Sequence, residues 1–210
     1  MDDNIISRVY VKTDDQDRII RCEGGYTTPS DLTEWVQIDE GTGDRYNLCQ
    51  SNYFEGGLYT EDGLSRYKLE NVQPIERTAE ELDADRLGPA KAAKIAKSKA
   101  ALAAYLVAHP LLWTDGEYYS ITAEKQAQLT SKIMAATMAY TLSQPYTLTW
   151  NSTGEVCKTW ELNDLSALAF AIDARVTALV TYQQTQEVAI NAAQTMAELE
   201  AIEVDYDTVQ

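Results

Sequence analysis

The sequence predicts an α+β protein, with a small N-terminal antiparallel β module followed by a mainly α-helical domain that carries two β-hairpins. Three observations lead to this class. Short strand-like runs separated by turn residues fill the N-terminal part. Apolar residues recur at helical spacing farther along. Two strand pairs, within residues 113–121 and 146–160, alternate with these helical stretches. We expect the β module at residues 1–83, a linker at 84–90 and the helical domain at 91–210.

The N-terminal module is expected to contain a hairpin, a third strand and a second strand pair. Aspartate and glycine mark the turns, because Asp side chains bond to nearby backbone groups and glycine accepts left-handed conformations. The first hairpin joins strands 9–12 and 18–22 through the acidic turn 14–17. A third strand is predicted at 34–38, and strands 58–60 and 66–69 are expected to pair around the turn 61–63.

Helices should begin near residue 78. Thr78 and Glu81 fit a capping box, in which each side chain satisfies a backbone N–H group of the first helical turn. Gly88 and Pro89 are expected to break this helix at once. A new helix is then predicted over residues 90–108.

The hairpin at 113–121 contains Asp115-Gly116, a dipeptide that favours a tight turn. The helix predicted to start at Thr122 places Leu129, Ile133, Ala136 and Tyr140 on one apolar face.

After the second hairpin comes the clearest helix, for which Asn163 is the expected N-cap. We expect an indole of this hairpin, Trp150 or Trp160, to pack against Leu168 or Ile172. Thr195 is the predicted N-cap of a short final helix. The apolar stripe of the long helix comprises Leu165, Leu168, Ala169, Ile172, Val176, Leu179 and Val180.

The net charge argues against nucleic-acid partners. The chain has 210 residues and a formal net charge of −16. Residues 1–87 hold nine Lys or Arg against twenty Asp or Glu, residues 88–132 six against three, and residues 133–210 two against ten. Such a surface repels the phosphates of duplex DNA.

The sequence also predicts a soluble chain made in a cytoplasm, without membrane insertion. Its first residues, MDDN, lack the cationic and apolar regions of a secretory signal. The most apolar window by inspection, residues 100–113, contains Pro110 and is shorter than the roughly 20 residues that cross a bilayer.

Residues suited to catalysis are sparse, and we expect no enzyme activity, metal or cofactor. Cys22, Cys49 and Cys157 form no metal-binding spacing, so buried or half-buried free thiols are expected. The single histidine, His109, precedes Pro110 where a helix must end, which favours a helix-end role. The glycine pairs do not open a helix after a strand, as a phosphate-binding loop would.

Two groups of residues are candidate partner contacts. Lys91, Lys94 and Lys97 could dock on an acidic surface, although a solvated helix start explains them as well. An aromatic group has apolar rings and hydroxyl tips that suit protein or sugar contacts, while core tyrosines on strands are the structural alternative. This group comprises Tyr46, Tyr53, Phe54, Tyr59 and Tyr67.

The C-terminal half resembles a domain of unknown function found at the C-terminus of bacteriophage tail-fibre-associated proteins. The resemblance rests on residues 118–122 (YYSIT), 160–162 (WEL) and 196–202 (MAELEAI). The first half is similar to small phage tail proteins encoded beside tail-fibre genes, through residues 8–14 (RVYVKTD), 56–59 (GGLY) and 66–69 (RYKL).

The resemblance implies a non-enzymatic bacteriophage tail protein. It would be a structural component of the tail fibre or baseplate, or the chaperone that assembles the fibre. Its partners would be tail-fibre or baseplate proteins, and it could also form a homo-oligomer. It would reside in the host cytoplasm during assembly, with the virion tail as a further location. Two alternatives are a receptor- or glycan-binding module at the tail tip and a small phage inhibitor of a host protein.

Overall fold

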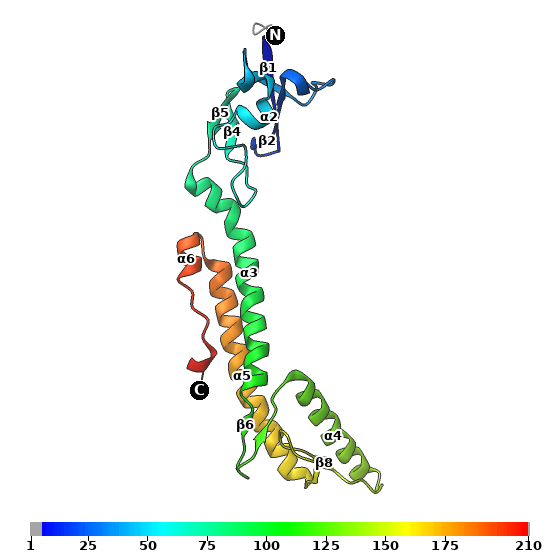
Figure 1. Ribbon diagram of the computed structural model, residues 1–210. Helices are drawn as coiled ribbons and strands as arrows, with labels where there is room; N and C mark the ends of the chain where they lie inside the picture. Colours follow the sequence, from blue (N-terminus) through cyan, green and yellow to red (C-terminus); the bar gives the residue numbers. More distant parts are fainter. Residues whose placement is uncertain (1–5, 210) are drawn as a thin grey trace. The chain divides into compact units, whose positions relative to one another are not determined.

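The computed structural model describes residues 6–209, and the chain divides into two compact units, Met1–Leu87 and Gly88–Gln210 (Figure 1). The α+β class is confirmed, because an antiparallel sheet precedes a region of long helices and small hairpins. The N-terminal sequence MDDN, used above to argue against a secretory signal, lies outside the described residues.

The N-terminal unit is built on a three-stranded antiparallel sheet in the order β2-β1-β3. The strands are β1 (Ser7–Thr13), β2 (Ile19–Gly24) and β3 (Val36–Gly41). In the turn between β1 and β2, the Asp14 carboxylate accepts hydrogen bonds from the backbone N–H groups of Gln16 and Arg18, both at 3.0 Å. The predicted first hairpin and third strand are therefore confirmed.

Two short helices, α1 (Asp44–Asn47) and α2 (Cys49–Asn52), follow the sheet, and a 3₁₀ turn, η1 (Gly25–Thr27), follows β2. Together with β1 and β2, the α2 region and the two residues after it contribute side chains to the hydrophobic core of this unit. The buried members of this core are Val9, Val11, Ile19, Cys22, Cys49, Tyr53 and Phe54.

The second predicted strand pair of this unit is only partly right. The turn at 61–63 forms, and Tyr59 bridges Ser65. The following strand, β4 (Tyr67–Glu70), instead pairs with β5 (Gln73–Glu76). Asn71 and Val72 turn the chain with φ values of 50° and 66°, which suits a tight two-residue hairpin. Val72 is an unusual residue at such a position, so no common turn motif marks this hairpin in the sequence.

The helix break expected at Gly88 and Pro89 is wrong, because α3 (Ala79–Ala108) continues through both residues. Residues 84–90 are helical, and the division between the two units falls inside α3. A proline inside a helix costs about 3 kcal/mol, since one hydrogen bond is lost. The predicted capping box forms at the start of α3, where Thr78 N–H donates to Glu81 Oε2 at 2.9 Å. An alanine-rich sequence then favours the helix after Pro89.

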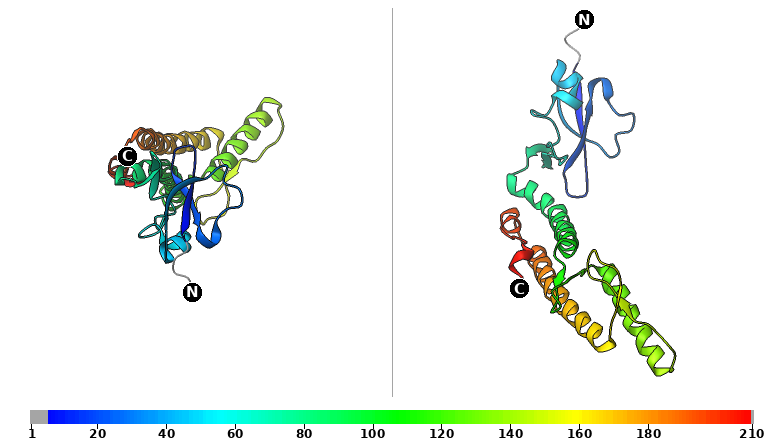
Figure 2. Two further views of the ribbon diagram at one scale, coloured as in Figure 1. Left: turned by 90° about the horizontal axis from the view of Figure 1, so that it is seen from above. Right: turned by 60° about the horizontal axis from the view of Figure 1, so that its bottom comes forward.

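The C-terminal unit contains the rest of α3, two hairpins and three further helices. In Figures 1 and 2, α3 and α5 run side by side, and α4 lies beside the N-terminal part of α5. Gly116 and Gly154 adopt φ values of 85° and 84° in the two hairpin loops, as the sequence suggested. The elements are β6 (Leu111–Leu112), β7 (Tyr118–Tyr119), α4 (Ala123–Thr141), β8 (Thr149–Trp150), β9 (Lys158–Thr159), α5 (Leu162–Ala192), α6 (Met196–Glu200) and the 3₁₀ turn η2 (Tyr206–Thr208).

Most helix limits agree with the sequence, with two corrections. Thr195 is the N-cap of α6, as predicted, and Thr122, the expected start of the second helix, is the N-cap of α4. Asn163 is not the N-cap of α5, because Glu161 holds that position and Asn163 lies within the helix. Tyr140 does not join the apolar face of α4, since 84% of it is exposed. This tyrosine lies in the last turn of α4, beyond the buried Ala136.

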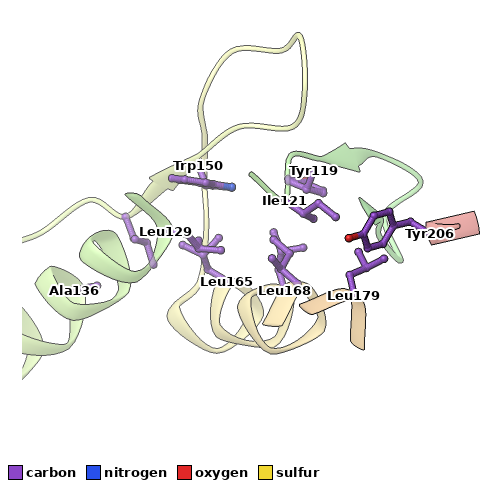
Figure 3. Packing of buried hydrophobic residues seen from close by; sticks show 11 residues of the cluster. Tyr119, Ile121, Leu129, Ala136, Trp150, Leu165, Leu168, Leu179 and Tyr206 are labelled. Atoms are coloured by element: carbon purple, nitrogen blue, oxygen red, sulfur yellow. The ribbon is translucent and has the colours of Figure 1, made fainter. Parts of the chain in front are cut away.

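The core of the C-terminal unit gathers around α5 (Figure 3). Leu165 and Leu168 of α5 lie near Trp150 and Tyr119, which come from the two hairpins. Trp150 is only 6% exposed, so the expected burial of one hairpin indole is confirmed. The chain end packs here too, because the Tyr206 hydroxyl donates to the Ser98 carbonyl oxygen at 3.0 Å.

Helix α5 is long and apolar enough to cross a membrane by length and composition, and 22% of its most apolar window is buried within the described residues. This helix differs from residues 100–113, the most apolar window by inspection of the sequence. Asp173 and Arg175 lie within α5, and a charged side chain at the centre of a membrane helix costs roughly 2.5–3.5 kcal/mol. Arg175 is engaged within the unit, where its guanidinium donates to the Val209 carbonyl oxygen at 2.6 Å.

Candidate binding surface at the start of helix α5

Two adjoining pockets lie where β9 leads into α5. The first, named here the indole pocket, has a volume of about 640 Å³ and contains Trp113 and Trp160. The second, the tyrosine pocket, has about 380 Å³ and contains Tyr140 and Tyr146. The two share the lining segment Thr159, Trp160 and Glu161, so they adjoin at this segment.

The hairpins and the helix start hold this shared segment in place. The backbone N–H of Trp160 donates to the Leu148 carbonyl oxygen at 3.0 Å. The Glu161 carbonyl oxygen accepts from the backbone N–H of Leu165 in the first bond of α5. The Trp160 ring meets Tyr119 edge-on, with ring centroids 5.7 Å apart. Its indole Nε1 is buried without a hydrogen-bond partner among the described residues. The segment is therefore fixed by both backbone bonds and packing.

An ion pair lies within the indole pocket. Lys158 Nζ is 3.0 Å from Asp115 Oδ2 and 5.3 Å from the centroid of the Trp160 ring. Burial raises the pKa of Asp115, but hydrogen bonds from Lys158 and Tyr119 lower it by more, so the net pKa lies below its ordinary value. The pKa of Lys158 is raised mainly by the hydrogen bond to Asp115. Both groups are therefore charged at neutral pH.

Two further carboxylates of the indole pocket have no such partner. Glu161 and Asp164 line the pocket, and no cationic group lies within 4 Å of either among residues 6–209. Both are exposed and lie at the start of α5, where the helix dipole stabilises negative charge. With the Lys158–Asp115 pair neutral, the pocket lining retains an excess of negative charge.

The C-terminal end of α4 contributes Ala136, Ala139 and Tyr140 to the tyrosine pocket and exposes an apolar stripe on another face of the helix. Met134, Met138 and Leu142 are 59%, 57% and 63% exposed and follow one another at four-residue spacing. Tyr140 and Tyr146 add their rings to the same end of the unit. The sequence reading missed this surface. A feature of the sequence marks this surface, because residues 133–154 contain no charged residue in a chain that is 24% charged.

The structure brings four of the five predicted aromatic contacts together, mostly as core. Tyr53 and Phe54 are buried. The Tyr53 ring meets those of Tyr46 and Phe54 edge-on, and the Phe54 ring lies tilted against that of Tyr67. Burial and the bond that Tyr53 donates to Asp39 Oδ2, at 3.0 Å, raise the pKa of Tyr53. These four residues pack in the core region of the N-terminal unit, and a role in partner contacts stays a prediction.

The remaining aromatic and one neighbouring pocket are more open. Tyr59 is 46% exposed, and its hydroxyl donates to the Ile20 carbonyl oxygen. A pocket of about 440 Å³ lies beside Tyr53, Phe54 and Tyr67. Arg45 lines it, with its guanidinium 4.9 Å from the Tyr53 ring centroid.

Two of the three predicted lysine contacts bind within the C-terminal unit. Lys91 Nζ donates to the Asn191 carbonyl oxygen at 2.9 Å, and Lys94 Nζ donates to the carbonyl oxygen of Leu199. These carbonyl groups lie at the ends of α5 and α6, where lysine side chains stabilise a helix. Lys97 is exposed. A role of the three in partner docking stays a prediction.

The residues considered for chemistry occupy separate places. His109 follows the end of α3, as predicted, with Nδ1 3.0 Å from the Tyr105 carbonyl oxygen. Cys22 and Cys49 are buried as expected, whereas Cys157 is exposed. The expectation for Cys157 fails because the residue lies in the β8–β9 loop, next to Val156, which is 85% exposed. Among residues 6–209, no group of three or more His, Cys, Asp and Glu side chains is arranged to hold a metal ion.

Comparisons with known proteins supply no relative. Neither a protein-family model, nor a curated protein, nor a solved structure matches the chain.

Proposed function

We propose that this chain is a non-enzymatic bacteriophage tail protein that works by binding another tail polypeptide. It would be a component associated with the tail fibre or baseplate, or the chaperone that assembles the fibre. The observation that carries the binding role is the exposed, uncharged apolar stripe at the C-terminal end of α4, the same end of the helix that lines the tyrosine pocket. The sequence resemblance supplies the class of partner.

The composition of this surface suits a protein interface. Interface cores are enriched in tyrosine and methionine and depleted of Lys, Glu and Asp. The end of α4 exposes Met134, Met138, Tyr140 and Leu142 and has no charge from residue 133 onward. Removing such side chains from water contributes about 25 cal/mol per Å² of apolar area. A fibre or baseplate segment can therefore cover this surface without meeting the acidic charge that dominates the chain.

The partner is tested by affinity capture from phage-infected cells, followed by mass spectrometry. We expect the tagged protein to retain a tail-fibre or baseplate protein, identified by its peptides. Met138→Asp should lower the captured amount about tenfold, because a charge is then buried in an apolar contact. Val188→Asp is the matched control, since Val188 is 69% exposed on the distant C-terminal part of α5. Capture of no tail protein, or equal loss in both variants, contradicts the proposal.

Purified virions separate the two forms of the proposal. A component of the tail should be present at stoichiometric copy number in the mass spectrum of the particle. A chaperone should be expressed during infection and absent from the particle.

One observation favours the glycan-binding alternative, namely the pocket at Arg45 in the N-terminal unit. An aromatic wall beside an exposed guanidinium suits an acidic saccharide, and no carboxylate lies within 4 Å of Arg45 among residues 6–209. This alternative predicts that the protein alone binds host cells. Arg45→Ala should abolish that binding, whereas Met138→Asp should leave it intact.

A further inference from the structure

We infer that the indole pocket binds the cationic side chain of an arginine carried by the bound polypeptide. This inference rests on the proposed function in one respect, because it takes the ligand to be a polypeptide. It adds the chemistry that the binding surface selects, which the apolar end of α4 does not specify.

The chain itself shows where a cation fits in this pocket. Lys158 Nζ lies between the Trp160 ring, 5.3 Å from its centroid, and Asp115 Oδ2, 3.0 Å away. A cation over an indole face gains roughly 0.5–2 kcal/mol, depending on its exposure to water. The pocket therefore combines an aromatic ring and a carboxylate in a geometry that already accommodates one positive group.

Charge remains in the pocket after this internal pair is formed. Glu161 and Asp164 line the same hollow and have no cationic partner within 4 Å among the described residues. Glu161 is the N-cap and Asp164 the third residue of α5, so both carboxylates belong to the start of this helix. An incoming anion would meet these two carboxylates, whereas an incoming cation would be paired by them. The excess of negative charge in the pocket therefore favours a positively charged ligand.

The guanidinium group fits the lining better than an ammonium group does. It is planar, weakly hydrated and able to stack on an indole such as Trp113 while donating several hydrogen bonds to carboxylates. The volume of about 640 Å³ lies within the range of roughly 300–1,000 Å³ for ligand pockets, so the side chain can enter with part of its backbone. The adjoining tyrosine pocket can then accept an apolar neighbour of the arginine.

The test measures binding of two short capped peptides to the full-length protein by calorimetry. One peptide carries arginine followed by leucine, and the other carries citrulline in place of arginine, which keeps the shape and removes the charge. We expect the arginine peptide to bind at least about tenfold more tightly and to lose affinity as salt is raised. Equal affinity for the two peptides, or no binding of the arginine peptide, overturns the inference.

Variants locate the site. Glu161→Gln together with Asp164→Asn should weaken the arginine peptide about tenfold and leave the citrulline peptide unchanged. The matched control is Asp173→Asn with Glu203→Gln, which changes the net charge equally at exposed positions outside the pocket. Trp113→Ala should also weaken binding, through a change that leaves the charge intact. Equal loss in the control pair assigns the effect to the general field of the protein and overturns the inference.

A further arm of the experiment separates this inference from the proposed function and from a sugar site. If neutral oligosaccharides bind this pocket and the arginine peptide does not displace them, the inference of a cationic ligand is overturned. Retention of a tail protein by the Glu161 and Asp164 variant at wild-type level overturns the inference while the proposed function stands. If the protein prefers the arginine peptide but captures no tail protein, the inference about the pocket stands and the proposed function is contradicted.

Discussion

Asp85 joins two arginines within the N-terminal unit. Its Oδ2 lies 2.7 Å from an Arg77 nitrogen and 3.0 Å from an Arg18 nitrogen. Arg77 is only 8% exposed and also donates to the Ser65 carbonyl oxygen at 3.0 Å. Burial raises the pKa of Asp85, but the hydrogen bond and charge of Arg77, and then those of Arg18, lower it by more. The carboxylate is therefore more acidic in the folded protein than in the unfolded chain.

This lowered pKa gives a direction for the effect of pH. The contribution of Asp85 to stability is complete above its ordinary pKa of about 3.9 and is lost as the pH falls through the lower folded value. We expect Asp85→Asn to lower the free energy of unfolding by up to about 3 kcal/mol at neutral pH, because Arg77 is left buried without its partner. The difference from wild type should shrink in acid. Urea unfolding at neutral pH and near pH 3 measures it, with the exposed Asp15→Asn as control. A difference that does not change with pH contradicts the assignment.

Trp150 provides a second prediction at the level of one side chain. It is 6% exposed and belongs to the cluster that contains Leu165 and Leu168. Trp150→Ala should cost roughly 3–5 kcal/mol, because buried apolar contacts are lost and a cavity remains. Phe170→Ala, at a position 75% exposed, should change stability by less than about 0.5 kcal/mol. Thermal unfolding of both variants checks this, and similar losses would contradict the burial of Trp150.

Sequence alone could identify buried residues where periodicity or a turn signal was strong. Leu165, Leu168 and Ile172 follow the helical repeat of α5 and are all buried. The same repeat places Tyr140 on the apolar face of α4, but this residue is 84% exposed at the edge of the tyrosine pocket. Periodicity shows which residues share a face, whereas burial requires a partner that the pattern does not reveal.

At the level of elements, the errors occurred where two local rules competed. Gly88 and Pro89 are strong helix breakers, yet α3 includes both, because capping before them and alanine after them favour a continuous helix. For the candidate surface, sequence identified the two hairpins and the helix that build it. It did not identify the pockets, since Trp113, Trp160 and Tyr140 come together only when the hairpins pack on α5.

Two glycines provide a test of backbone conformation within elements. A Cβ atom added at Gly88 or Gly63 would meet no other atom within 4 Å, so packing is equal at the two sites. Gly88 lies inside α3, whereas Gly63 has a φ of +83°. Gly88→Ala should therefore stabilise the protein by about 0.5–1 kcal/mol, because alanine loses less entropy in a helix. Gly63→Ala should destabilise it by about 1 kcal/mol or more. Chemical denaturation measures both, and destabilisation by Gly88→Ala would contradict a continuous α3.

At the level of the whole chain, the two units have separate hydrophobic cores with no residue in common. Ile19 lies in the core of the N-terminal unit and Leu168 in that of the C-terminal unit, and neither is exposed. The tryptophans are unevenly divided, because Trp35 belongs to the first unit and the other three to the second. Tryptophan fluorescence therefore reports mainly on the C-terminal unit, while calorimetry reports on both.

This division predicts two unfolding transitions that respond to different mutations. Ile19→Ala should cost about 2–5 kcal/mol in the N-terminal unit and lower one calorimetric transition, with little change in the midpoint followed by fluorescence. Leu168→Ala should cost a similar amount in the C-terminal unit and lower the fluorescence midpoint together with the other calorimetric transition. Each variant thus serves as the control for the other. If both variants instead lower one common transition, followed equally by heat and by fluorescence, the two cores unfold as a single cooperative structure and the division fails as a description of stability.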